Sequence, residues 1–195
     1  MPKLGKLSQN IKLYEISQPE LSKISTLSTP QALLAIIKIP KSEELTTKSL
    51  KGSFSLALDN IQDPGNLGTI IRTADWFGLK YIICSTDTVD VYNPKVVQAS
   101  MGSLARVKVI YTDLEDFLKN TELPIFGALL DGISVYKTDF GNEGILLLGN
   151  EGNGISNDLL KLITFPVTIP RFGRAESLNV AISASIFCSE LRRNS

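Results

Sequence analysis

Histidine is absent from this sequence of 195 residues, and cysteine occurs only twice, at Cys84 and Cys188. Without an imidazole group, serine-triad catalysis, most zinc enzymes and the usual histidine general base are excluded. The two cysteines lie far apart and lack the CxxC spacing of a metal site, so we expect no metal and no disulfide. Free thiols also fit a reducing compartment. Any chemistry must therefore come from other side chains.

The sequence also lacks an excess of either charge and any long apolar run. Its 20 basic residues balance its 20 acidic ones, so a site for a nucleic acid would have to be a local basic patch. No apolar run approaches the roughly 20 residues that a transmembrane helix needs. The first ten residues, "MPKLGKLSQN", lack the apolar core of a signal peptide. We therefore expect a cytoplasmic protein without a membrane segment.

The apolar residues, 43% of the total, are arranged differently in two parts of the chain. From residue 53 onward, short apolar runs alternate with helical patterns, which predicts an α/β domain with a mainly parallel sheet flanked by helices over 51–195. Residues 1–50 contain two strand-like stretches, "IKLYEI" and "ALLAIIKI", around the helix-like "PELSKISTL". Two strands and one helix bury too little surface to be stable alone, so we predict a short appendage and linker there.

The first stretch with chemical potential is "DNIQDPGNLGTIIRTADWFG", residues 59–78, where we predict a helix from about Asn66 to Phe77. In one interpretation Asn66 is the N-cap and Arg72 pairs with Asp75 on a solvated face. In the other, Asn66 and Arg72 lie at the mouth of a site. The stretch by itself leaves both interpretations open.

Two later stretches each follow an apolar strand pattern. "ILLLGNEGNG" ends in a loop rich in glycine, which indicates either a close approach of a ligand to the backbone or a tight turn. "IPRFGRAESLNVAIS" carries Arg171 and Arg174 before a helix start, where Ser177 is an N-cap or part of a site for an anion such as phosphate. Neither GxGxxG after the first strand nor a P-loop occurs. In parallel sheets, ligands bind at the carboxyl ends of strands, where both loops are expected.

Together, these three stretches, in this order and with "DVYNPKVVQASMGSLARVKV" between them, resemble the SpoU/TrmH family of SPOUT RNA ribose 2′-O-methyltransferases. The resemblance covers about residues 53–193. It implies a C-terminal deep trefoil knot, S-adenosylmethionine as cofactor, rRNA or tRNA as substrate, and a homodimer. Family members commonly carry an N-terminal RNA-binding domain, and "TPQALLAIIK" is similar to the end of one, so residues 1–50 are expected to be an incomplete version.

The resemblance also implies roles for individual residues. Five are assigned to catalysis or to the shape of the active site: Asn66, Arg72, Glu151, Ser177 and Asn179. Six are assigned to cofactor binding: Leu148, Gly149, Asn150, Gly152, Ile169 and Leu178. Because a guanidinium group stays protonated in proteins, we interpret Arg72 as a phosphate anchor that stabilises the developing alkoxide, and not as the base. The alternative function is a catalytically silent RNA-binding module, against which the presence of all five residue types argues.

The C-terminal helical pattern has two apolar stripes. One contains Val180, Ala184, Phe187 and Leu191; the other, nearly opposite, contains Leu178, Ile182 and Ile186. A helix that is apolar on both sides has to be buried twice. This pattern predicts a homodimer built on the helix, unless the N-terminal appendage covers the second stripe.

Overall fold

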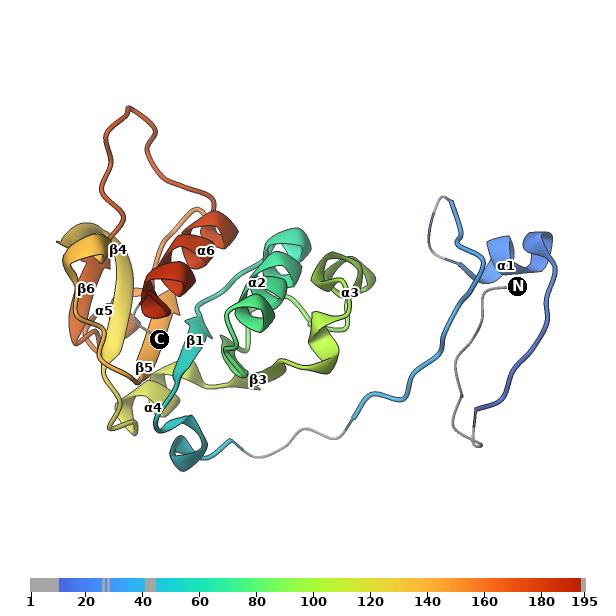
Figure 1. Cartoon of the computed structure of the whole chain (residues 1–195), viewed down its shortest axis with the longest axis horizontal. Helices are drawn as coiled ribbons and strands as arrows, with labels where there is room; N and C mark the ends of the chain where they lie inside the picture. The colour runs from blue at the N-terminus through green and yellow to red at the C-terminus, as the bar shows by residue number, and fades with distance from the viewer. Residues whose placement is uncertain (1–10, 26, 28, 41–44, 194–195) are drawn as a thin grey trace. The chain divides into compact units, whose positions relative to one another are not determined.

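The structure is a computed structural model that describes residues 11–25, 27, 29–40 and 45–193 (Figure 1). The chain divides into two compact units, Met1–Lys41 and Ser42–Ser195. The larger unit contains all the residues assigned to the site.

The described part of the first unit contains one helix, α1 (Gln18–Ile24), which begins with a capping box in which the backbone N–H of Ser17 donates to Glu20 at 2.7 Å. The two predicted strands, at 11–16 and 32–39, are wrong, because no described residue of this unit forms a strand. Their apolar side chains remain exposed, as in Tyr14 at 78% and Ile36 at 94%. An apolar run becomes a strand only when a neighbouring strand pairs with its backbone, and the described residues provide none.

The second unit is built on a six-stranded sheet in the order β3-β2-β1-β5-β4-β6. The strands are β1 (Phe54–Leu58), β2 (Tyr81–Ser85), β3 (Lys108–Thr112), β4 (Ile125–Ser134), β5 (Gly144–Leu148) and β6 (Phe165–Thr168). Every strand pairing is parallel. The central strands β1 and β5 are buried along their whole length, which explains their continuous apolar sequences. The predicted α/β class with a mainly parallel sheet is confirmed; the knot stays a prediction.

Helices cover both faces of the sheet. The helices are α2 (Pro64–Trp76), α3 (Pro94–Ser100), α4 (Leu114–Lys119), α5 (Asn157–Leu160) and α6 (Val180–Leu191), with short 3₁₀ turns at Thr47–Leu50, Ser103–Ala105 and Val135–Lys137. One core joins α2, α3 and α6 to the sheet, and a second joins α4 and α5 to the opposite face. Helices α2 and α6 lie side by side (Figure 1), and Thr73 Oγ1 is 3.1 Å from Ser185 Oγ between them.

The arrangement of the strands decides where the site is found. Because the strands are parallel, the loops that follow β1, β5 and β6 leave the same edge of the sheet. Helices α2 and α6 begin after the loops that follow β1 and β6. Three stretches that lie far apart in the sequence therefore meet at the carboxyl edge of the sheet.

Candidate functional site

Three side chains, one from each of the three stretches, form a continuous hydrogen-bonded chain. Asn66 Nδ2 donates to Glu151 Oε1 at 2.9 Å, and Asn179 Nδ2 donates to Asn66 Oδ1 at 2.9 Å. Asn66 lies in the first turn of α2, Glu151 in the loop after β5, and Asn179 directly before α6. The structure thus brings together three of the five residues assigned to catalysis.

Helices α2 and α6, which both contribute to these hydrogen bonds, are not capped by Asn66 and Ser177, the N-caps that the sequence suggested. Asp63 caps α2, because its Oδ1 accepts from the backbone N–H of Asn66 at 2.8 Å. Asn179 caps α6 by accepting from the N–H groups of Ala181 and Ile182. The interpretations of Asn66 and Ser177 as N-caps are therefore wrong. Pro64 favours the first helical position, which makes Asp63 the N-cap of α2 and leaves the Asn66 side chain available for other contacts.

The loop after β5 is held in a closed shape by Asn150. Its backbone N–H and C=O both bond to Gly154, each at 2.9 Å, and its Oδ1 accepts from the N–H groups of Gly152 and Asn153 at 2.9 and 3.0 Å. Asn150 Nδ2 donates to the carbonyl of Asn60 at 2.7 Å, which ties the loop to the end of β1. Glu151 therefore projects from a loop whose backbone is largely fixed.

The three glycines of this loop have different reasons to be glycine. A Cβ on Gly149 would lie 2.2 Å from the carbonyl carbon of Gly154, and Gly154 itself has a left-handed φ of +69°. A Cβ on Gly152 would meet only Asn150 Oδ1, at 3.6 Å. The loop's own geometry thus requires Gly149 and favours Gly154, whereas nothing in the described residues restricts Gly152.

Sequence reasoning missed two residues that support the loop. Asp59 is only 7% exposed; its Oδ2 accepts from the N–H of Ser156 at 2.7 Å, and its own N–H donates to the carbonyl of Leu148 at 2.9 Å. Asn60, with φ of +55°, supplies the carbonyl that holds Asn150. The available signal was a pair of polar residues directly after a buried strand, in "LALDN".

Arg72 and Ser177 lie outside the hydrogen-bonded chain. Both are exposed, and neither side chain has a hydrogen-bond or ion-pair partner among the residues that the structure describes. The interpretation in which Arg72 pairs with Asp75 is wrong, because Arg106 binds that carboxylate, with Nη2 2.7 Å from Oδ2. The Arg72 guanidinium is therefore available to a ligand.

The segment between β6 and α6 extends away from the rest of the domain (Figure 1). It carries two cationic residues, Arg171 and Arg174. Arg171 Nη1 donates to the carbonyl of Ala175 at 3.4 Å, and Arg174 is exposed. Apolar side chains accompany them: Phe172 is 96% exposed and Leu178 is 49% exposed, while Ile169 packs against the core. This segment thus offers both positive charge and apolar surface next to the start of α6.

The described residues contain no group of three histidine, cysteine, aspartate or glutamate side chains that could hold a metal ion. Both cysteines are buried, and burial raises the pKa of Cys84 and raises that of Cys188 to about 12. Neither thiol is therefore a nucleophile at neutral pH. Nor is any helix in the described ranges long and apolar enough to cross a membrane.

Comparison with known proteins gives consistent results. The model of the SpoU rRNA Methylase family matches residues 53–189. The 23S rRNA (guanosine(2553)-2′-O)-methyltransferase RlmP of Bacillus subtilis is 33% identical over 190 residues, which are 95% of this chain and 75% of the relative. The 23S rRNA (guanosine-2′-O-)-methyltransferase RlmB of Neisseria meningitidis is 30% identical over 95% of this chain and 78% of its own.

Solved structures agree with the sequence relatives. An RNA methyltransferase of the TrmH family from Porphyromonas gingivalis, described as putative, has a TM-score of 0.80 and 42% identity, covering 97% of this chain and 74% of that one. AviRb from Streptomyces viridochromogenes, in complex with AdoMet, has a TM-score of 0.67 and 33% identity over 73% of this chain and 57% of that one. Because the family model matches residues 53–189 and RlmP is 33% identical over 95% of the chain, this chain belongs to the SpoU rRNA Methylase family.

Proposed function

We propose that this chain transfers a methyl group from S-adenosylmethionine to a ribose 2′-hydroxyl of structured RNA, rRNA or tRNA. The observation that carries this proposal is the chain of hydrogen bonds from Glu151 through Asn66 to Asn179, which joins three separate stretches at the ligand-binding edge of a parallel sheet. RlmP and RlmB, the two sequence relatives described above, are 23S rRNA methyltransferases, which favours rRNA as the substrate. An RNA substrate also favours a cytoplasmic location.

The loop after β5 fits a cofactor that contacts the main chain. A Cβ built on Gly154 would have no neighbour within 4 Å, and one on Gly152 would be in ordinary contact with a single side chain, so a ligand can reach this backbone. Ile169 and the half-exposed Leu178 supply apolar contact for an adenine ring. We infer that these residues, with Leu148, Gly149 and Asn150, hold the cofactor in the C-terminal part of the fold, for which the knot is predicted.

S-adenosylmethionine supplies an electrophilic methyl group and leaves as a neutral thioether, so the protein's main task is to align and activate the ribose hydroxyl. In this proposal the hydrogen-bonded side chains of Glu151, Asn66 and Asn179 form one wall of the site, and Ser177 also takes part in its shape. Arg72 is exposed and permanently charged. In this proposal its guanidinium binds an RNA phosphate and stabilises the negative charge that develops on the ribose oxygen.

The same proposal includes a homodimer. On α6, the side chains of Val180, Ala184 and Phe187 are buried in the core, whereas Ile182 is 52% exposed. Trp76, on the neighbouring helix α2, is 84% exposed. A second copy of the chain would cover these exposed apolar side chains. The function proposed for residues 1–50, an incomplete RNA-binding unit, rests on sequence resemblance alone.

Two measurements test the function. Calorimetry measures S-adenosylmethionine binding directly, and tritium-labelled cofactor measures transfer to 23S rRNA or tRNA transcribed in vitro, which carries no methyl groups. A ribose 2′-O-methyl group blocks alkaline cleavage of the adjacent phosphodiester bond, so the label should appear in alkali-resistant dinucleotides. Cofactor binding without transfer to either RNA would instead favour the silent module, and label released as methylated base would refute ribose as the acceptor.

A further inference from the structure

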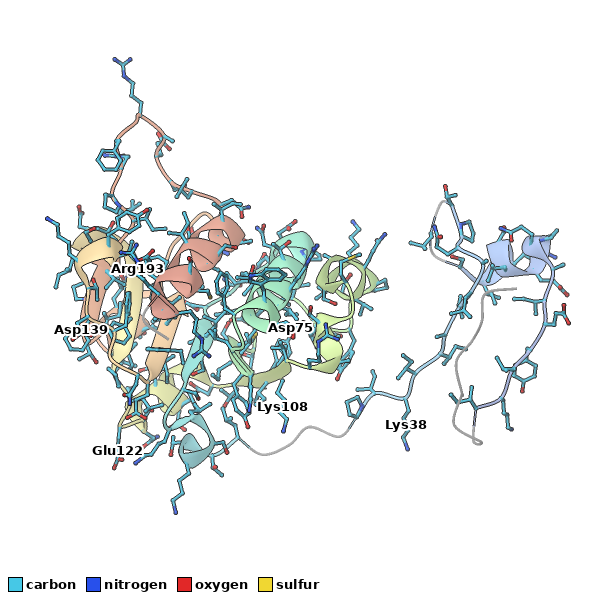
Figure 2. The ribbon with its side chains drawn as sticks, viewed as in Figure 1. Lys38, Asp75, Lys108, Glu122, Asp139 and Arg193 are labelled. Atoms are coloured by element: carbon cyan, nitrogen blue, oxygen red, sulfur yellow. The ribbon has the colours of Figure 1, made fainter. Side chains whose placement is uncertain are left out.

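Asp75, labelled in Figure 2, lies on α2, and its ion pair with Arg106 connects this helix to the segment that precedes β3. Arg106 Nε lies 3.0 Å from Oδ2 and 3.1 Å from Oδ1, and Nη2 lies 2.7 Å from Oδ2. Arg106, and after it Ser103, hold the pKa of Asp75 below its ordinary value. Both oxygens of the carboxylate are therefore engaged by one guanidinium fork, the most directional pairing available to a carboxylate.

Asp75 lies three residues after Arg72 on the same helix. Side chains three residues apart on a helix are neighbours on its surface, so this carboxylate is the nearest sequence-local counterion for Arg72. Nevertheless, Arg72 makes no ion pair among the described residues, whereas Arg106 reaches Asp75 from 31 positions away in the sequence. Within the described part of the chain, Asp75 is therefore paired with Arg106, and Arg72 has no ion-pair partner.

We propose that Arg106 is a positioning residue that occupies Asp75 and so keeps the guanidinium of Arg72 free to bind an RNA phosphate. This inference rests on the proposed function of Arg72. With Arg106 present, these three side chains carry a net charge of +1. Without Arg106, Asp75 neutralises Arg72 and also repels the phosphate that approaches it.

A purely structural role for Arg106 makes a different prediction. An exposed ion pair contributes little to stability, and removing either partner, or both, would then lower activity only through that small loss. In the positioning role, removing Arg106 alone is harmful because it releases the carboxylate, and removing the carboxylate as well restores Arg72. The double variant therefore distinguishes the two roles.

The experiment compares Arg106→Ala, the double variant Asp75→Asn with Arg106→Ala, and the control Lys161→Ala, which breaks a pair of equal length, 2.7 Å, with Asp158 on α5. The first readout is the NMR signal of the Arg72 Nε–H group, identified by its absence in Arg72→Ala. We expect this signal to shift in Arg106→Ala, to return to its wild-type position in the double variant, and to stay unchanged in Lys161→Ala.

The second readout is methyl transfer to 23S rRNA transcribed in vitro. Arg106→Ala should raise KM for RNA by about three- to tenfold, with kcat less affected. This range combines the strength of an ion pair between Arg72 and Asp75 on the helix surface with the repulsion between Asp75 and the RNA phosphate. The double variant should recover most of this loss. An unshifted Arg72 signal, or a double variant no better than Arg106→Ala, overturns the inference. A wild-type protein that transfers no methyl group, with the expected NMR shifts, would overturn the proposed function and leave the positioning intact.

Discussion

Replacement of Gly149 by alanine tests whether the loop after β5 depends on its own backbone packing. The added Cβ would lie 2.2 Å from the Gly154 carbonyl carbon and 2.3 Å from the Ile155 nitrogen. Carbon atoms in contact are normally about 3.5–4.0 Å apart, so the overlap exceeds 1 Å. The obstructing atoms belong to the backbone, and the two hydrogen bonds between Asn150 and Gly154 hold them in place. The clash therefore cannot be relieved by rotating a side chain.

The expected cost follows from this overlap. Overpacking of a well-packed region typically destabilises a protein by about 1–3 kcal/mol. For a domain of this size, each kcal/mol lowers the melting temperature by about 2–4 °C, so Gly149→Ala should melt about 2–12 °C below the wild type. Thermal unfolding measures this shift, and calorimetry should show weaker S-adenosylmethionine binding because the loop has to rearrange.

Gly152 provides the matched control. An added Cβ there would be at an ordinary contact distance of 3.6 Å, so Gly152→Ala should change stability by less than about 0.5 kcal/mol. A larger side chain, in Gly152→Val, should fill the space that the cofactor requires and weaken its binding while the fold remains stable. If Gly149→Ala melted and bound cofactor like the wild type, the steric reasoning would be refuted. Wild-type affinity in Gly152→Val would exclude Gly152 from the cofactor site.

Four further substitutions test other parts of the molecule. Arg72→Ala should lower single-turnover methyl transfer by about 10² to 10³ while calorimetry still shows cofactor binding; an unchanged rate would contradict its assignment. Asn179→Asp should keep the cap of α6, and hence the melting temperature, but lose the bond to Asn66 and most of the activity. Full activity would show that this bond is dispensable. Ser55 Oγ is buried without a hydrogen-bond partner among the described residues. Ser55→Ala should therefore leave the urea midpoint unchanged or raise it, with a gain in the free energy of unfolding of at most about 1–3 kcal/mol. A lower midpoint would contradict this. Ile182→Glu should convert a dimer to monomers in light scattering; a monomeric wild type of 21.3 kDa with intact activity would refute the dimer.

The strands of the larger unit could be predicted from the sequence because short apolar runs mark them. The apolar runs of the larger unit became strands near their expected positions because a parallel sheet buries its central strands on both faces. The same pattern failed in residues 11–16 and 32–39. A strand needs a neighbouring strand that pairs with its backbone. The apolar residues of a segment do not show whether such a neighbour exists.

The structure joins three of the residues assigned to the site by hydrogen bonds that the sequence did not indicate. The parallel-sheet pattern predicted that the loops after the strands "ILLL" and "VTIP" lie at the carboxyl ends of strands. No local rule indicates that Asn66 would bridge Glu151 and Asn179. The pairing of Asp75 with Arg106 was missed for a related reason. The helix-surface rule favours Arg72 as the partner, whereas tertiary packing brings in a guanidinium group from a distant segment.

The bridge through Asn66 also affects when the site can form. Its two hydrogen bonds span 85 and 113 residues of sequence, and the second one requires the start of α6, the last helix described. Contacts of such long sequence separation form late, because the intervening chain must first be ordered. During synthesis, a ribosome-bound chain that lacks α6 would therefore contain all six strands of the sheet but not the complete hydrogen-bonded bridge. Methyl transfer should thus begin only after α6 has left the ribosome and packed against α2.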